Sequence, residues 1–216
     1  MSDCATCGSR SFCNSTSEEC TVAKKENLLP LAEGATVKHV VGIYGAKGGV
    51  GTTLITAALA AALQAAGRRV AVIDAAVCSP DLPIFLGSEG QTSMDGEFFR
   101  PQITASGIQI LSFANFMADA SEPLLWESSM MAGVTQQFWC ATLWDDVDIM
   151  LIDLPSQGGS VPLQLFASLP FETIFLVSTG EPTTLLRCEQ ARNFLDWNQV
   201  PCGGLIYNKA GTRGEA

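Results

Sequence analysis

Apolar and polar residues alternate in blocks along most of this chain. Short runs rich in Val, Ile, Leu and Ala end at loops rich in Gly, Pro, Ser or Asp, a pattern typical of strands buried on both faces of a sheet. The predicted strands cover residues 40–44, 70–74, 108–113, 149–154, 174–178 and 204–207. The predicted helices between them cover residues 53–66, 128–143, 161–168 and 183–197.

Strands this apolar, separated by segments of helix length, predict an α/β fold in which helices cover both faces of a mostly parallel sheet. Residues 37–216 form this predicted domain. Residues 1–36 are polar and lack a hydrophobic period, as expected of a cysteine-rich tail or a small knuckle organised by metal. Ligands of such sheets bind beyond the carboxyl ends of the strands, where we therefore look for a site.

Residues 45–53, between the first predicted strand and the first predicted helix, read Gly-Ala-Lys-Gly-Gly-Val-Gly-Thr-Thr. In this setting glycines let successive backbone N–H groups turn inward, and the start of the helix adds its positive dipole end, so the loop binds phosphate. The usual loop ends Gly-Lys-Ser/Thr, and its lysine reaches the β- and γ-phosphates. Here Thr52 stands in place of that lysine, and Ala46 stands where the first glycine is expected, while Lys47 remains.

Two acidic residues end predicted strands in the same part of the fold. Asp153 has the position of the acid that holds Mg²⁺, directly or through water, in phosphate-loop proteins. Asp74 either lies near the magnesium or simply terminates its strand. We expect the Thr53 hydroxyl to bind the magnesium ion and the Thr52 N–H to donate a hydrogen bond to phosphate. The candidates for binding ATP or ADP with Mg²⁺ are Ala46, Lys47, Gly48, Gly49, Val50, Gly51, Thr52, Thr53, Asp153 and Asn208.

The composition excludes several classes of protein. Apolar residues make up 47% of the 216 residues and charged residues only 16%, as expected of a packed domain and not of a disordered chain. The net charge of -10 argues against nonspecific binding of nucleic acid. The longest apolar stretch, residues 54–66, is too short to cross a bilayer, so we expect no membrane segment. With no basic, apolar leader, the expected compartment is the cytoplasm, where thiols stay reduced.

Eight cysteines in such a chain require an explanation, and four of them, Cys4, Cys7, Cys13 and Cys20, lie within the first twenty residues. Four thiolates close together suit either a [4Fe–4S] cluster or tetrahedral zinc. We expect Cys140 and Cys188 to be small buried apolar residues, and the roles of Cys78 and Cys202 stay open. The single histidine, His39, is expected to be structural.

The core from about residue 37 to 209 resembles the Mrp family of iron–sulfur cluster carrier ATPases, within the MinD/ParA group of deviant P-loop proteins. The resemblance is carried by Lys47-Gly48-Gly49-Val50-Gly51, Ile73-Asp74-Ala75 leading to Pro80, Pro83 and Leu86-Gly87, Gly107-Ile108-Gln109-Ile110-Leu111-Ser112, Leu125-Trp126 and Leu151-Ile152-Asp153-Leu154-Pro155. It implies a homodimer with nucleotide at the interface and apo iron–sulfur proteins as clients. Membrane attachment is not expected, since the amphipathic carboxyl-terminal helix of MinD has no counterpart in this sequence.

The resemblance also implies roles for single residues. Lys47 would reach across to the partner's nucleotide, or else only cap its own loop. Asn208 would read adenine, although an asparagine after a strand is often only a turn former. The spacing Cys4-x-x-Cys7-x5-Cys13 is similar to the end of the ferredoxin-like motif of cytosolic iron–sulfur scaffold relatives, with Cys20 as a fourth ligand. This similarity favours an iron–sulfur cluster over zinc.

The chain departs from its family around the γ-phosphate. The family's Asp-Ala-Asp is Asp74-Ala75-Ala76 here, Ser160 stands in place of another aspartate, and the loop lysine has become Thr52. The family's carboxyl-terminal Cys-x-x-Cys pair, which bridges a dimer with a cluster, is also missing. Each lost charge-assisted hydrogen bond costs roughly 1.5–3 kcal/mol, or about one to two decades in rate if it acts only in the transition state. We therefore expect nucleotide binding with slow or no hydrolysis.

The sequence is compatible with three functions. The first is an adenine-nucleotide-binding iron–sulfur carrier or scaffold of Mrp type. The second is an inert organising protein, since residues 45–53 also resemble the loop of the TadZ/CpaE pilus-localisation proteins, which lack the same lysine. The third is a redox subunit that passes electrons through the amino-terminal cluster to a larger complex.

Overall fold

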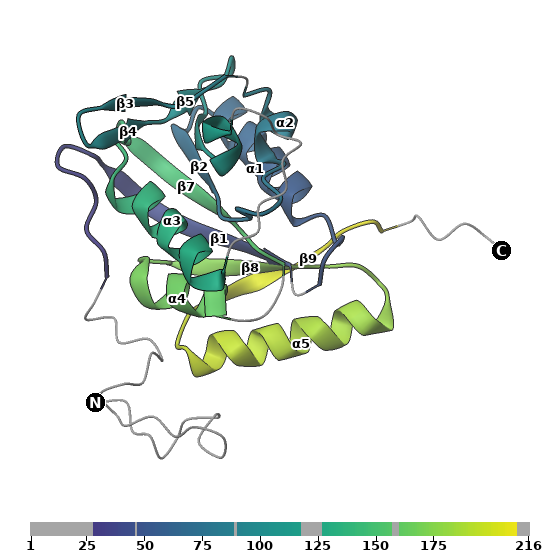
Figure 1. Ribbon diagram of the computed structural model, residues 1–216. Coiled ribbons are helices and arrows are strands. Elements are labelled where there is room, and N and C mark those ends of the chain that lie inside the picture. Colours follow the sequence, from purple (N-terminus) through teal and green to yellow (C-terminus); the bar gives the residue numbers. More distant parts are fainter. Residues whose placement is uncertain (1–27, 46, 89, 118–126, 157–159, 211–216) are drawn as a thin grey trace, which may run out of the picture.

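The computed structural model describes residues 28–45, 47–88, 90–117, 127–156 and 160–210, which contain a seven-stranded sheet in the order β5-β6-β2-β7-β1-β8-β9 (Figure 1). Neighbouring strands are parallel, except that β5 runs antiparallel to β6. The strands are β1 (Val37–Gly45), β2 (Val70–Asp74), β5 (Gln102–Ile103), β6 (Gln109–Leu111), β7 (Val147–Leu154), β8 (Thr173–Ser178) and β9 (Cys202–Tyr207). The predicted mostly parallel sheet is confirmed.

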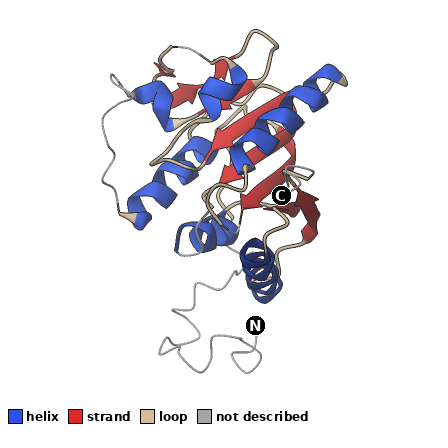
Figure 2. Cartoon of the chain, turned by 90° about the vertical axis from the view of Figure 1, so that its right-hand side faces the viewer, coloured by secondary structure: helices blue, strands red, loops and turns tan. Residues whose placement is uncertain are grey.

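Helices cover both faces of the sheet (Figures 1 and 2). On one face lie α1 (Thr52–Ala65) and α2 (Leu82–Leu86), and on the other α3 (Ser128–Cys140), α4 (Ser160–Ser168) and α5 (Pro182–Trp197). Val70 and Val72 of β2 pack in a cluster with residues of α1, whereas Ala71 and Ile73 pack in the cluster that includes α3, α4 and α5. Since successive side chains of a strand point to opposite faces, a strand between two helical layers needs an unbroken apolar run.

Two predicted elements end earlier in the structure than in their apolar patterns. The strand predicted to continue to residue 113 stops at Leu111, because Ser112 begins the 3-10 helix η3 (Phe113–Phe116). The Ser112 hydroxyl accepts a hydrogen bond from the N–H of Ala114 at 3.3 Å. Helix α3 ends at Cys140, three residues before its predicted end at residue 143.

Several short elements were not predicted: α2, β5, η3, and the hairpin of β3 (Ser93–Asp95) and β4 (Phe98–Arg100). The hairpin turns at Gly96, which has a left-handed φ of 62°, and the side chains of Asp95 and Arg100 pair across it. An Asp-Gly dipeptide is a known hairpin signal. Strands of three residues, however, are too short to display an alternating pattern.

The segment just before β1 packs on the domain. The N–H of Leu29 donates to the Ser168 carbonyl at 2.8 Å, and the indole of Trp139 donates to the Leu29 carbonyl at 2.8 Å. The N–H of Thr36 donates to the carbonyl of Trp144 at 3.1 Å. Residues 1–27 lie outside the described ranges, so the division of the chain at residue 36 stays a prediction.

Within the described ranges, no helix has the length and apolar composition needed to cross a bilayer.

Two glycines allow a matched test of packing. A Cβ on Gly42, in the middle of β1, would lie 3.0 Å from Ile174 Cγ1 and 3.1 Å from both Leu154 Cδ1 and Phe171 Cε1. Overpacking of this kind lowers the free energy of unfolding by about 1–3 kcal/mol, which is what we expect of Gly42→Ala. In the control, Gly133→Ala within α3, the new Cβ meets nothing within 4 Å, so stability should rise by about 0.5–1 kcal/mol. Urea denaturation measures both changes, and shifts of the same sign would contradict the packing described here.

Candidate functional site

The loop between β1 and α1 is shaped by two glycines in the left-handed region. Gly49 has a φ of 81° and Gly51 a φ of 92°, and helix α1 begins directly after Gly51, at Thr52. A Cβ on Gly51 would also collide with Nδ2 of Asn208. The first N–H groups of a helix have no intrahelical partner and, together with the helix dipole, bind anions. Ala46, the remaining candidate of this loop, lies outside the described residues.

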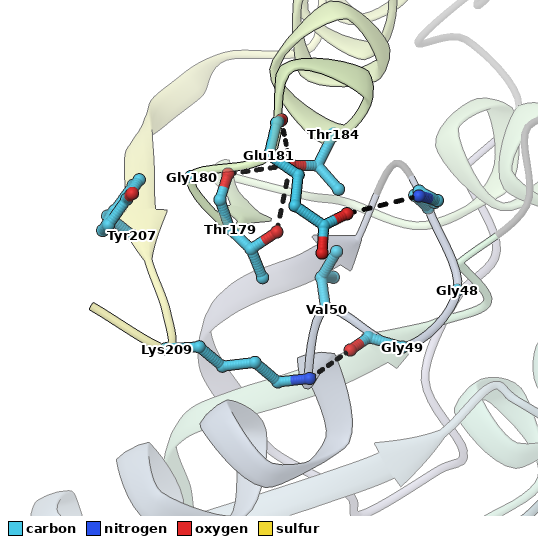
Figure 3. A pocket seen from close by; sticks show the side chains of 10 residues that line it. Gly48, Gly49, Val50, Thr179, Gly180, Glu181, Thr184, Tyr207 and Lys209 are labelled. Carbon is cyan, nitrogen blue, oxygen red and sulfur yellow. Dashed lines mark hydrogen bonds and ion pairs between the residues drawn. The ribbon is translucent and has the colours of Figure 1, made fainter. Parts of the chain in front are cut away.

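The chain after β9 holds this loop in place. The Asn208 side chain donates from Nδ2 to the carbonyl of Val50 at 2.8 Å, and Lys209 Nζ donates to the carbonyl of Gly49 at 2.8 Å (Figure 3). The Asn208 N–H donates to the carbonyl of Ser178 at the end of β8, at 2.8 Å. Asn208 thus positions the loop, a role that the sequence did not suggest, while its role toward adenine stays a prediction.

Lys47 lies at the front of the loop, where α5 begins. Its Nζ donates to Oγ1 of Thr183 at 3.2 Å and lies 3.6 Å from Oε2 of Glu181. The side chains of Lys47 and Glu181 are 45% and 67% exposed. Ion pairs this exposed contribute little free energy, so Lys47 is easily released from this arrangement.

A cavity of about 630 Å³ opens between the loop, the start of α5 and the end of β9 (Figure 3). It is lined by Lys47, Gly48, Gly49, Val50, Thr179, Gly180, Glu181, Thr184, Tyr207 and Lys209. Its volume lies within the range of roughly 300–1,000 Å³ that is usual for small-molecule sites. Glu181, Thr184, Tyr207 and Lys209 were not among the candidates, because the fold alone brings β8, α5 and β9 to this loop.

The threonines at the start of α1 point toward the sheet. Thr52 is buried, and its hydroxyl lies so close to the end of β1 that a Cβ on Gly45 would collide with it. One turn later the hydroxyl of Thr56 lies 3.0 Å from the Thr52 carbonyl and 3.2 Å from Oδ1 of Asp153. Thr56, missed by the sequence analysis, therefore joins the first turn of the helix to the acidic end of β7.

Asp74 and Asp153 are register partners on the adjacent strands β2 and β7. Both are buried, with 0% and 1% of their surface exposed. Asp74 accepts hydrogen bonds from the N–H of Ala76 at 3.1 Å and from the hydroxyl of Ser112 at 3.0 Å. Among the described residues, Oδ2 of Asp153 has no hydrogen-bond partner.

The electrostatic cost of this arrangement appears in the pKa values. Burial, and then the nearby charge of Asp74, raise the pKa of Asp153 to about 7, although the hydroxyls of Thr53 and Thr56 lower it. Burial raises the pKa of Asp74 to about 6, against the hydrogen bonds from Ser112 and Ala76. A bound cation would favour both ionised forms, and Mg²⁺ prefers oxygen ligands. The orphaned oxygen and the two carboxylates therefore fit a magnesium site.

The cysteines of the domain are scattered. Cys188 is buried, Cys140 and Cys202 are half-buried, and Cys202 begins β9 and does not lie in a loop. Cys78 is exposed, with its Sγ 3.1 Å from Sδ of Met131. Over the ranges that the structure covers, no three His, Cys, Asp or Glu side chains gather as a metal site. Cys4, Cys7, Cys13 and Cys20 lie outside those ranges.

The fold, the glycine loop and the acidic strand ends together define the class of P-loop NTPases. Residues 36–215 match the family model described as ParA, NUBPL iron-transfer P-loop NTPase. The chain therefore belongs to this family of iron-transfer P-loop NTPases, and the resemblance to the Mrp family of iron–sulfur cluster carriers, within the MinD/ParA group, is confirmed.

Curated relatives agree with this assignment. The iron-sulfur cluster carrier protein of Methanocaldococcus jannaschii is 30% identical over 213 residues, covering 96% of this chain and 71% of the relative. The protein of the same name from Clostridium perfringens is 30% identical over 218 residues, covering 97% of this chain and 77% of the relative.

Solved structures share the fold. A nucleotide-binding protein of Archaeoglobus fulgidus in complex with ADP is 26% identical with a TM-score of 0.66, over 79% of this chain and 66% of that one. The septum site-determining protein MinD of Pyrococcus horikoshii, complexed with Mg-ADP, is 22% identical with a TM-score of 0.59, over 83% of this chain and 70% of that one. The second likeness supports the fold alone.

The buried carboxylates predict how the stability of metal-free, nucleotide-free protein depends on pH. Because folding raises the pKa of Asp153 to about 7 and of Asp74 to about 6, from the usual 3.8, the folded state binds more protons than the unfolded state in between. This contribution is fully present below about pH 4 and is lost as pH rises through 6 to 7, at about 1.4 kcal/mol for each pKa unit. Asp153→Asn, which cannot ionise, should reduce this loss of stability between about pH 4 and 7. Urea denaturation in EDTA measures the free energy of unfolding at each pH. Parallel curves of this free energy against pH for the parent and the variant would contradict the raised pKa of Asp153.

Proposed function

We propose that this chain is an adenine-nucleotide-binding carrier of iron–sulfur clusters, with weak or absent ATP hydrolysis. The observation that carries the proposal is the loop with left-handed Gly49 and Gly51 at the start of α1, facing a cavity of about 630 Å³. The match of the chain to a family of iron-transfer P-loop NTPases supports an iron–sulfur cluster as the cargo. So do relatives named iron-sulfur cluster carrier proteins. The cytoplasm, where thiols stay reduced, is the compartment that suits such cargo.

The site residues have separate tasks in this proposal. The backbone N–H groups of residues 48–53 bind the phosphates, together with the Ala46 and Lys47 end of the loop. The Thr53 hydroxyl and Asp153 hold Mg²⁺, which when bound neutralises phosphate charge. The orphaned Oδ2 of Asp153 supports its assignment, while Asp74 lies beside it in the same buried layer. Asn208 reads adenine from the end of β9.

We propose Cys4, Cys7, Cys13 and Cys20 as the ligands of the cluster, with a [4Fe–4S] cluster favoured over zinc. Thiolates accept either metal, so the residues alone do not decide between them. The support comes from their spacing and from the family. Residues 1–36 would then form the cluster-binding segment and residues 37–216 the nucleotide-binding domain.

We further propose a homodimer closed over nucleotide, in which Lys47 reaches the partner's phosphates. The weak contacts of Lys47 with Glu181 and Thr183 at the rim of the cavity support this role, since little free energy is lost when they break. Apo iron–sulfur proteins would be the clients, and neither nucleic acid nor a membrane is a partner.

We expect slow hydrolysis because of the residues that surround the proposed phosphate site. Thr52 is buried against the end of β1, so its side chain does not replace a lysine that reaches the β- and γ-phosphates. Ala76 offers only its backbone N–H, which is bonded to Asp74. Nucleotide would be retained by backbone N–H groups and Mg²⁺, with little extra stabilisation of the transition state.

Anaerobic purification tests the carrier proposal. Protein prepared without oxygen should be brown, contain iron and sulfide in equal amounts, bind ADP, and transfer its cluster to an apo-protein. Replacing Cys4, Cys7, Cys13 and Cys20 by serine should abolish iron binding and leave ADP binding unchanged, whereas Cys202→Ser, the matched control, should keep the iron.

Other results of that preparation would point elsewhere. Zinc without sulfide would overturn the cluster. Iron that is reversibly reduced but never transferred would indicate the redox subunit. Protein that binds neither iron nor zinc would indicate the inert organising protein.

The turnover proposal has its own test. Thr52→Lys combined with Ala76→Asp should raise kcat for ATP hydrolysis about hundred- to ten-thousand-fold, because each of the two restored charges stabilises the transition state by roughly 1.5–3 kcal/mol. Thr52→Ser is the control, since it keeps the hydroxyl and adds no charge. Parent protein that already hydrolyses ATP as fast as the double variant would refute the idea that these losses limit turnover.

A further inference from the structure

The phosphate loop of this chain lacks a charge at the position where such loops carry one. Thr52 replaces the lysine that normally reaches the β- and γ-phosphates. Its side chain is turned toward Gly45 and is not part of the cavity lining. A ligand with two or three phosphates carries several negative charges, so a lysine entering from elsewhere would change its affinity considerably.

Lys209 enters the cavity from the opposite wall. It follows β9, and its Nζ donates to the carbonyl of Gly49, at the centre of the phosphate loop and 160 positions away in sequence. Figure 3 shows the extended side chain running from the end of β9 to this loop. Both Lys209 and Gly49 line the cavity, so the ammonium group lies beside the phosphate loop, on the side of the Gly49 carbonyl.

The backbone directs Lys209 to this place. Its φ of 56° is left-handed, a conformation that residues other than glycine adopt infrequently and that is concentrated at functional sites. Asn208 supports the turn, because its Oδ1 accepts the N–H of Lys209 at 2.9 Å while its Nδ2 donates to Val50. Two consecutive residues after β9 thus bond to two consecutive carbonyls of the phosphate loop.

We propose that Lys209 is the phosphate-binding lysine of this protein, taking over from the end of β9 the task that Thr52 cannot perform. The proposal rests on the nucleotide binding proposed above. An ammonium group has three donors on a flexible four-carbon stem, so Lys209 can reach from the Gly49 carbonyl to a phosphate oxygen bound by the loop. A charge-assisted bond of this kind is roughly twice as strong as a neutral one.

The competing explanation is that Lys209 only clamps the loop. A clamp acts through the shape of the loop, whose N–H groups bind the same phosphates, so its loss would also weaken ATP and ADP and spare AMP. A clamp needs only a donor for the Gly49 carbonyl, which a neutral amide can supply, whereas a phosphate ligand needs the positive charge. Lys209→Gln therefore separates the two roles.

The experiment measures dissociation constants of ATP, ADP and AMP with Mg²⁺ by calorimetry or by displacement of a fluorescent nucleotide. Lys209→Met and Lys209→Gln should each weaken ATP and ADP about ten- to hundred-fold and leave AMP unchanged, while Lys209→Arg, which keeps the charge, should bind all three nearly normally. Adding Thr52→Lys to Lys209→Met should restore the affinity for ATP. Lys38→Met is the control, since Lys38 pairs with Asp148 at the other end of β1.

Each failure has a distinct meaning. Parent protein that binds no adenine nucleotide would refute nucleotide binding itself, and this inference with it. Parent protein that binds ATP as tightly as Lys209→Met does would overturn the inference alone. Lys209→Gln that binds ATP as tightly as the parent would also overturn it, and would leave Lys209 as a clamp.

Discussion

The parallel pairing of β2 with β7 places the carboxyl groups of Asp74 and Asp153 side by side in a layer from which water is excluded. Burial is the main reason that both pKa values rise, and the charge of Asp74 raises the pKa of Asp153 further. The sheet tolerates the two acids because Ser112, Ala76 and Thr56 donate hydrogen bonds to their oxygens. The bond from Thr56 also fixes the first turn of α1 to β7, so the acids and the phosphate loop form one unit.

The last strand of the sheet is as important to this unit as the first. Asn208 and Lys209 bond to the carbonyls of Val50 and Gly49, so the shape of the phosphate loop depends on β9 being paired with β8. Carbonyls on the outer side of a glycine-rich loop need partners just as the inward N–H groups need a ligand. The structure satisfies them from a strand that follows the loop by more than 150 positions.

Much of this architecture was predictable because it is local. The strand at residues 70–74 was read from its apolar run with the bounds that the structure shows, and the starts of α1 and α3 were placed within one residue. The short elements around Asp95 and Leu82 were missed, because five residues or fewer carry no period. Asp153 was recognised as a candidate from its position at a strand end, whereas Thr56 carried no signal beyond helical spacing from Thr52.

By itself the sequence determined the alternation of strands and helices, the glycine loop between the first pair, and the loss of its lysine. These are properties of neighbouring residues, set by periodicity and by the conformations that glycine permits. The tertiary structure alone decided which distant groups meet there: Lys209 at Gly49, Asn208 at Val50, and Asp74 beside Asp153. The order and register of parallel strands bring these groups together, and that order depends on how whole helical layers pack against the sheet.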